Sequence, residues 1–254
     1  MGLHHTRLGS WLQCASAALF PLLGGVRGGF AAFETRRHFQ NNCEYFGQTV
    51  SRMKEPDFRQ AIADYIRANA QPPDKFSHQP RLYQLAKRLA EDLPFDDDVL
   101  YAAAWMHDLG VFIGHRPEEP AALAAWDNLA YAVKEVPRLL RRFGLPAAKI
   151  PAVIEVIRTH LPSTKPTSFE GTLLRDADIL EQLGAIGILR MVSKVGRDTR
   201  FVRFADALRV LQRNAEQLPA QLHLASARRW AAPRVKILKA FLRAAEAEAG
   251  GVEW

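Results

Sequence analysis

Cysteine is scarce in this sequence: only Cys14 and Cys43 occur among its 254 residues. Two cysteines cannot build a disulfide framework or a zinc site made of cysteine ligands. Apolar residues make up 48% of the chain and charged residues 24%, close to the average of globular proteins, which excludes disorder throughout. Because nothing in the cysteine usage points to an oxidising compartment, we expect a cytoplasmic protein.

A long apolar run is also missing. The nearest approach is the stretch from Trp11 to Phe33, which is interrupted by Gln13, Pro21 and Arg27. A transmembrane helix needs about 20 consecutive apolar residues, so we expect no membrane partner.

Two catalytic motifs are absent as well. The chain has no Gly-x-Ser-x-Gly sequence, which would present a nucleophilic serine on a sharp turn. It has no glycine-rich phosphate loop of the Walker type. Nucleophilic catalysis by serine or cysteine and P-loop chemistry are therefore disfavoured.

Acidic residues are outnumbered by basic residues mainly in the C-terminal quarter of the chain. The net charge is +7, and residues 185–254 hold 13 Lys and Arg against 6 Asp and Glu. Residues 53–184 hold 16 basic and 19 acidic residues. Because the excess of positive charge is local, the chain as a whole does not have the pattern of a nucleic-acid-binding surface.

Residues 1–52 differ in composition from the rest. They contain no lysine, and their first acidic residue is Glu34. Arg7 precedes an apolar run that faintly resembles the core of a signal peptide. We expect a poorly ordered leader or a stretch included through an upstream start codon; export or organelle targeting is the alternative. Residues 53–254 are then the folded domain.

From Met53 onward the apolar residues recur with helical period. Leu82, Leu85, Ala86 and Leu89, for example, fall on one face of a helix. Capping residues, prolines and glycines set the expected ends. The pattern predicts an all-α fold, with helices over 58–71, 77–93, 96–109, 121–143, 146–160, 169–192, 200–217 and 220–248.

Three predicted helices carry groups that suit a divalent metal ion. His107 and Asp108 end an apolar helix, and His78 begins another. Taken alone, the pair is as readily a buried salt bridge, and His78 a capping residue. Imidazole and carboxylate groups that meet in one place are the ligands of transition metals, and of Mg when oxygen ligands dominate.

The third helix offers two aspartates, Asp176 and Asp178. Apolar residues lie one turn away from Asp176 on both sides, whereas Arg175, Glu181 and Gln182 surround Asp178. This facing argument favours Asp176 as the inward ligand.

The strings HQPRLYQLAKRLA, LYAAAWMHDLG and RDADILEQLGAIGILR together resemble the HD-domain metal-dependent phosphohydrolases, and in particular their small bacterial branch. That family has a His, a later His-Asp pair and a still later Asp. The similarity covers about residues 57–248. It implies a compact helical bundle with the metal-site core at about 76–192 and further C-terminal helices at 200–248.

The resemblance implies one divalent ion (Mn, Fe, Ni, Co or Zn, with Mg possible) held by His78, His107, Asp108 and Asp176. A metal-activated water would hydrolyse a phosphoester or phosphoanhydride bond of a small molecule, most simply a nucleotide. Asp108 would also orient that water.

Four further residues are candidates for contacting the phosphate: Arg81, His115, Arg116 and His160. Arg81 lies one turn from His78, and the others lie in loops or at a helix end. Each is equally compatible with a solvated surface position.

A second hypothesis stays open. The chain could be a non-catalytic, metal-stabilised helical protein whose basic C-terminal quarter binds nucleic acid or an acidic partner. Most of those basic residues are spaced as on a solvated helix face, so we do not expect nucleic acid as the partner.

Overall fold

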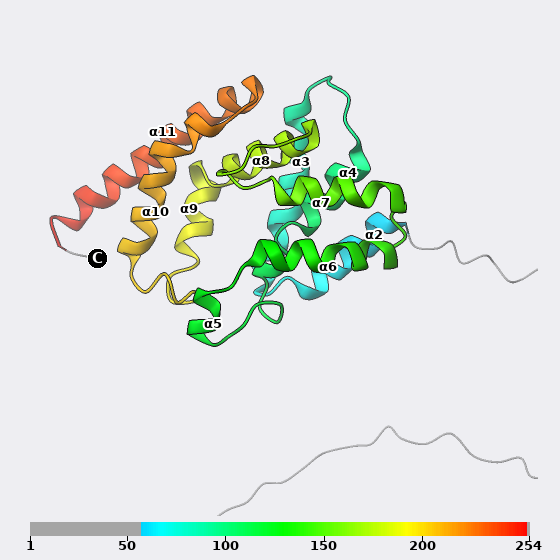
Figure 1. Ribbon diagram of the computed structural model, residues 1–254. Helices are drawn as coiled ribbons and strands as arrows, with labels where there is room; N and C mark the ends of the chain where they lie inside the picture. The colour runs from blue at the N-terminus through cyan, green and yellow to red at the C-terminus, as the bar shows by residue number, and fades with distance from the viewer. Residues whose placement is uncertain (1–56, 253–254) are drawn as a thin grey trace, which may run out of the picture. The chain divides into compact units, whose positions relative to one another are not determined.

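The computed structural model describes residues 57–252. The expected leader at 1–52 lies outside the described residues. The described part is all-α, as predicted, with one isolated β-bridge between Ile113 and Arg116 (Figure 1). Its α-helices are α2 (Phe58–Asn69), α3 (His78–Ala90), α4 (Asp97–Met106), α5 (Pro120–Ala124), α6 (Asn128–Arg142), α7 (Ile150–Arg158), α8 (Phe169–Glu181), α9 (Gly184–Val192), α10 (Phe204–Gln217) and α11 (Ala225–Ala249). None of these helices is long and apolar enough to cross a bilayer.

Short polar side chains set the start of several helices. Asp57, Asp96, Asp127 and Ser168 each accept hydrogen bonds from backbone N–H groups in the first turn that follows. These N–H groups have no partner inside the helix, so a side-chain acceptor at this position stabilises the helix end.

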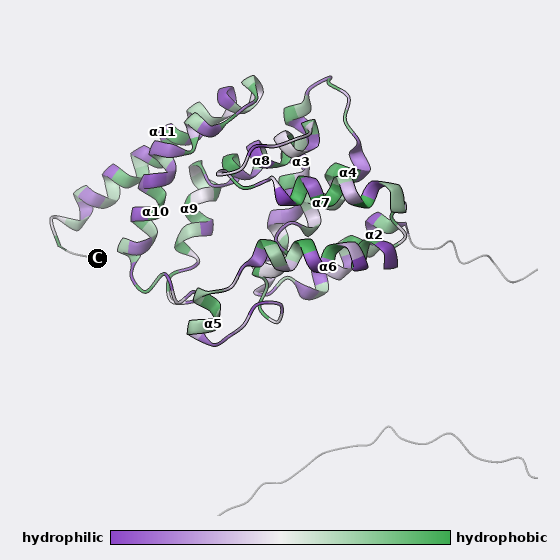
Figure 2. Cartoon of the chain, viewed as in Figure 1, coloured by the Kyte–Doolittle hydropathy of each residue, from purple (hydrophilic) through white to green (hydrophobic). Residues whose placement is uncertain are grey.

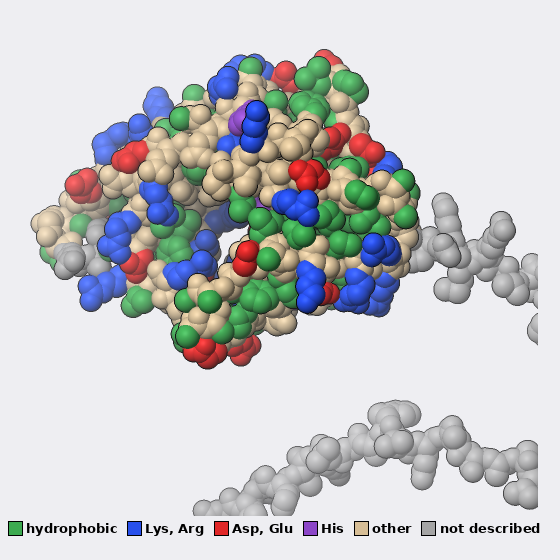
Figure 3. Space-filling model, in the orientation of Figure 1, with side chains coloured by type: hydrophobic (Ala, Val, Ile, Leu, Met, Phe, Trp, Pro, Cys, Tyr) green, Lys and Arg blue, Asp and Glu red, His purple; other side chains and the backbone are tan. Residues whose placement is uncertain are grey.

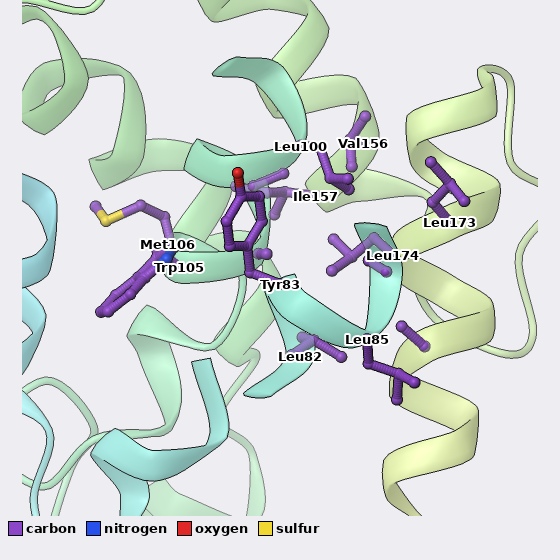
Figure 4. Packing of buried hydrophobic residues seen from close by; sticks show 14 of the residues in the cluster. Leu82, Tyr83, Leu85, Leu100, Trp105, Met106, Val156, Ile157, Leu173 and Leu174 are labelled. Carbon is purple, nitrogen blue, oxygen red and sulfur yellow. The ribbon is translucent and has the colours of Figure 1, made fainter. Parts of the chain in front are cut away.

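The core forms where α3, α4, α7 and α8 pack together. Every residue of α4 from Val99 to Met106 is buried, which explains why its sequence is apolar all round. Figure 4 shows side chains of α3, α4, α7 and α8 meeting in this core. Apolar colouring elsewhere follows the inner faces of the amphipathic helices, as Figure 2 shows for α6. Three of these core helices, α3, α4 and α8, also carry the predicted site residues.

Two long helices expected from the sequence are each divided. The stretch 121–143 contains α5 and α6, because Asp127 caps a new helix start, while Pro137 lies inside α6. The stretch 169–192 contains α8 and α9, because Gly184 adopts a positive φ of 69°. A Cβ at Gly184 would also lie 3.0 Å from the side chain of Arg234, so glycine is required there.

Helices α9, α10 and α11 lie side by side, and α8 and α3 connect them to the core (Figure 1). One polar residue that connects this group to the core is Asp176 of α8. Its carboxylate accepts hydrogen bonds from the backbone N–H groups of His223 and Leu224, immediately before α11 begins.

Candidate metal centre

His78 is the first residue of α3 and is only 5% exposed. Its Nδ1 lies 3.3 Å from Oε2 of Glu181, and since a carboxylate only accepts, Nδ1 carries the proton. Burial and the charge of Arg190 lower the pKa of His78. The imidazole is therefore neutral at neutral pH, and its unprotonated Nε2 can bind a metal.

His107 directly follows the last residue of α4, and its ring is also held through Nδ1. Its Nδ1–H donates to the carbonyl of Ala104 at 3.0 Å, and the ring is 1% exposed. Its Nε2 faces the carboxylate of Asp108, 3.6 Å away. A metal-binding histidine usually donates its other ring N–H to a carboxylate or a carbonyl, and both histidines do so here.

Asp108 follows directly and precedes a short 3-10 turn. Burial works against ionisation of its carboxyl, but His107, His78 and Arg190 hold its pKa well below the usual value. The side chain is 24% exposed, more than either histidine. Asp108 is therefore an ionised carboxylate that also reaches toward solvent.

The later aspartate that joins these groups is Asp178. Its Oδ1 lies 3.5 Å from Nε2 of His78. His78, His107 and Asp178 each offer one ligand atom, and these three atoms all lie within 4.8 Å of one another. Oδ2 of Asp108 is 3.8 Å from Nε2 of His78, so two imidazoles and two carboxylates converge from three segments of the chain.

The structure does not bring Asp176 to this group, which corrects the facing argument. Asp176 is completely buried and its carboxylate is occupied by the N–H groups of His223 and Leu224. Helix α8 packs against α3, α4, α7 and α11 and is buried on nearly all sides, so an apolar face does not identify the side that carries the site. Of the polar neighbours of Asp178, Glu181 contacts His78.

Glu181 contacts His78, and Arg81 in turn contacts Glu181. Arg81 donates to the two carboxylate oxygens of Glu181 at 3.3 and 2.8 Å, and to Oγ of Ser77. Although burial opposes ionisation, the hydrogen bonds from His78 and Arg81 lower the pKa of Glu181 to about 2. The guanidinium of Arg81 is thus held by Glu181 and orients His78, rather than facing a phosphate as we expected.

His160 lies inside the site, as the spacing suggested it could. It is 3% exposed, its ring centroid is 5.0 Å from that of His107, and Nδ1–H donates to the carbonyl of Ile157. Burial and the charge of His107 lower its pKa. A neutral ring beside the metal ligands can accept a hydrogen bond or bind a cation through Nε2.

The two remaining candidates differ in their surroundings. His115 hydrogen bonds with the hydroxyl of Tyr131 and contacts Asn69, so the structure does not bring it to the site. Arg116 is largely buried, and its Nη1 lies 4.0 Å from Oδ2 of Asp198.

Sequence reasoning set Asp178 aside in favour of Asp176 and missed two further residues close to this group, Glu181 and Arg190. Nη2 of Arg190 lies 3.5 Å from Nε2 of His78, and Nη1 lies 3.8 Å from Oδ1 of Asp178. The available signal was the spacing of Asp178 and Glu181, one helical turn apart, which places two carboxylates on the same face of α8.

Comparison with known proteins agrees with this geometry. The family model for the HD domain matches residues 76–183, which include His78, the His107-Asp108 pair and Asp178. No curated protein matched the chain.

Several solved bacterial structures share the fold. YpgQ of Bacillus subtilis is 22% identical, covers 79% of this chain and all of its own, and has a TM-score of 0.60; it has also been solved in complex with ADP. An HD-superfamily hydrolase from Bacillus thuringiensis is 21% identical, with 76% of this chain and 97% of its own covered and a TM-score of 0.55. A predicted HD-superfamily hydrolase from an uncultured Thermotogales bacterium is 24% identical, with 74% and 91% covered and a TM-score of 0.52.

The matched segment begins just before α3 and ends just after α8, so it contains every helix that supplies a residue to the converging group. The fold that surrounds this segment is the one seen in solved HD-superfamily hydrolases. Residues 76–183 are therefore identified as an HD domain.

Proposed function

We propose that this protein is a metal-dependent phosphohydrolase that cleaves a phosphoester or phosphoanhydride bond of a nucleotide. The observation that carries the proposal is the convergence of two imidazoles and two carboxylates, from His78, His107, Asp108 and Asp178. Nδ1 of His78 contacts Glu181, and Nδ1 of His107 contacts the carbonyl of Ala104. Such contacts orient the two rings before a metal ion binds.

These four residues would hold one divalent ion. A mixed set of nitrogen and oxygen ligands suits Mn, Fe, Ni, Co or Zn, while Mg prefers a set richer in oxygen. When bound, such an ion acidifies water and offsets the charge on phosphoryl oxygens.

We assign two further roles to residues of the chain. Asp108 is ionised and the most exposed of the four metal-ligand candidates, so it accepts a hydrogen bond from the attacking water and orients it. His160 lies beside His107 with Nε2 available, and holds the substrate phosphate or its leaving oxygen.

A nucleotide is the preferred substrate class for two reasons. The solved complex of YpgQ with ADP supports a nucleotide ligand in this fold. In this chain, Arg190 contacts His78 and Asp178 at the open side of the site, where a phosphate would need a cation. We place the activity in the cytoplasm, in keeping with the scarcity of cysteine.

The test combines metal analysis with hydrolysis. The purified protein, loaded in turn with Mn, Co, Ni, Zn and Mg, is assayed for phosphate or pyrophosphate release from a panel of nucleotides. We expect about one ion per chain, and hydrolysis that falls by about a hundredfold or more in Asp108→Asn.

Asp64→Asn is the matched control, because Asp64 is exposed and pairs only with neighbours on α2. It should retain full activity. A metal-loaded protein that hydrolyses no phosphorylated compound, or an Asp108→Asn variant as active as the wild type, would contradict the proposal.

A further inference from the structure

Arg190 of α9 contacts the same atoms that we assign to the metal ion. Its Nη2 lies 3.5 Å from Nε2 of His78, and its Nη1 lies 3.8 Å from Oδ1 of Asp178. Nη1 also lies 3.8 Å from Oε2 of Glu181 and donates to the backbone carbonyl of Glu181 at 3.4 Å. One guanidinium group therefore contacts two of the four candidate ligands.

Arg190 reaches these ligands from a helix that supplies none of them. Helix α9 begins at Gly184, whose positive φ turns the chain after α8. Figure 3 shows Lys and Arg side chains lining a hollow beside α9, which Figure 1 locates. The side chain of Arg190 is 31% exposed, against 7% for His78 and 14% for Asp178. Because a third of it is open to solvent, the guanidinium can turn away while the ligands stay packed.

The contact with His78 uses the lone pair that a metal ion needs. A neutral imidazole has one N–H and one unprotonated nitrogen that accepts. Nδ1 carries the proton, since it faces a carboxylate oxygen of Glu181. Nε2 is therefore both the acceptor for an N–H of Arg190 and the ring nitrogen that can bind a metal. A single lone pair cannot serve both partners at once.

The charges around His78 lead to the same exclusion. Carboxylate oxygens of Asp108, Asp178 and Glu181 lie 3.3–3.8 Å from its ring nitrogens. Carboxylates held this close repel one another, and the guanidinium of Arg190 offsets that repulsion. A divalent ion bound to His78 and Asp178 would itself supply the positive charge and would repel the guanidinium beside it.

We infer that Arg190 competes with the metal ion for His78 and Asp178, so that the ion binds only as the guanidinium turns away from Nε2. Arg190 thereby stabilises the metal-free protein and lowers the metal affinity of the site. This inference rests on the metal site of the proposed function, and not on the identity of the substrate. A guanidinium released in this way is also free for the phosphate contact proposed above.

The first test measures metal affinity without substrate. Mn²⁺ is titrated calorimetrically into the metal-free full chain as wild type, Arg190→Met and Arg190→Lys. Methionine removes the charge and the N–H donors but keeps an unbranched side chain. We expect Arg190→Met to bind Mn²⁺ about tenfold or more tightly than the wild type. Arg190→Lys keeps the charge, so it should bind Mn²⁺ less tightly than Arg190→Met.

The direction of the change distinguishes competition from structural support. If Arg190 only held the ligands in place, its removal would weaken Mn²⁺ binding. Arg138→Met is the matched control, because Arg138 is exposed and pairs with Glu135 on its own helix, α6. It should bind Mn²⁺ as the wild type does. An affinity of Arg190→Met that is unchanged or weaker overturns the inference.

The second test measures stability. A ligand that binds only the native state raises the melting temperature more when it binds more tightly. We therefore expect Arg190→Met to melt below the wild type in EDTA and to gain more than the wild type from the same concentration of Mn²⁺. A variant that folds only with Mn²⁺ would show the same effect more strongly. Equal gains in the two proteins would contradict the competition.

The third test uses the wild type alone and so does not depend on how a variant folds. Phenylglyoxal modifies accessible guanidinium groups, and mass spectrometry of a digest measures the modification of each arginine. We expect Mn²⁺ to increase the modification of Arg190 and to leave that of Arg138 unchanged. Modification of Arg190 that stays constant or decreases with Mn²⁺ would show that the guanidinium is not displaced.

The outcomes separate this inference from the proposed function. If Mn²⁺ affinity rises in Arg190→Met but no nucleotide is hydrolysed, the phosphohydrolase proposal fails and the competition stands. If nucleotides are hydrolysed and Mn²⁺ affinity does not rise in Arg190→Met, the competition alone is overturned. A wild type and an Arg190→Met variant that both bind no divalent ion would overturn both.

Discussion

At the scale of single residues, Asp176 and Asp178 show how two neighbouring carboxylates can serve different parts of one molecule. Asp178 faces His78, whereas Asp176 accepts two backbone N–H groups ahead of α11. Residues two apart on a helix point about 200° away from each other, so the two roles cannot be exchanged.

We predict that Asp178→Ala loses bound metal and activity but keeps most of its stability. Asp176→Ala should keep the metal and lose about 2 kcal/mol or more of unfolding free energy, because the N–H groups of His223 and Leu224 are left without an acceptor. Metal content by mass spectrometry and denaturant unfolding of both variants check this. Loss of metal in Asp176→Ala, with metal retained in Asp178→Ala, would instead support Asp176 as the metal ligand.

The sequence predicted His78, His107, Asp108 and His160 close to the site, and the structure brings these four together. It could not separate Asp176 from Asp178, because the facing argument assumes one buried face, and α8 is buried on nearly all sides. The partners that occupy Arg81 and His115 also could not be foreseen, since Glu181 and Tyr131 reach them through tertiary packing.

At the scale of helices, the close approach of α6 to the end of the His-Asp segment positions Asp108. Gly110 lies two residues after Asp108, and its carbonyl accepts a hydrogen bond from the indole of Trp126. A Cβ at Gly110 would lie 2.5 Å from the backbone oxygen of Asn128, where α6 begins. Only glycine allows the two segments to come this near.

We predict that Gly110→Ala lowers the unfolding free energy by about 1–3 kcal/mol, because α6 must move away. Gly171→Ala is the matched comparison: the new Cβ would meet its nearest neighbours at 3.4 Å, an ordinary contact, inside the first turn of α8. That variant should be neutral or more stable by about 0.5–1 kcal/mol. Thermal unfolding of the two variants tests this prediction. If Gly110→Ala is as stable as Gly171→Ala, α6 moves away without a loss of unfolding free energy.

Helical periodicity predicted the class of every element but not all the boundaries. The break between α8 and α9 depends on Gly184, whose positive φ is imposed by packing against Arg234. Similarly, Asp127 begins α6 only because its side chain reaches the N–H of Ala130. Both boundaries depend on local interactions. Because the apolar pattern continues through them, periodicity alone does not locate them.

At the scale of the whole molecule, the four metal-ligand candidates all lie among the described residues, between His78 and Asp178. We therefore propose that residues 53–254 form the functional domain.

A chain shortened to residues 53–254 is expected to fold, to bind the same number of metal ions and to retain hydrolysis. Metal analysis, melting temperature and the nucleotide panel, compared with the full chain, test this. A shortened chain that is insoluble or free of metal would show that residues 1–52 contribute to the site.

Basic residues of the C-terminal quarter have partners within the chain in several places. Arg228 donates to the carbonyl of Leu222, Arg229 pairs with Glu91, and Arg209 pairs with Asp206. Binding of nucleic acid by this region stays a prediction of the alternative hypothesis, and a steep decrease of RNA or DNA affinity with salt would support it.

The candidate metal ligands and Arg190 are supplied by different segments. The ligands belong to α3, the end of α4 and α8, whereas Arg190 belongs to α9. Arg190, which contacts Asp178, lies beyond the end of the HD domain match. Under the proposed function, the segment that follows α8 can therefore change in sequence while the set of candidate metal ligands stays the same.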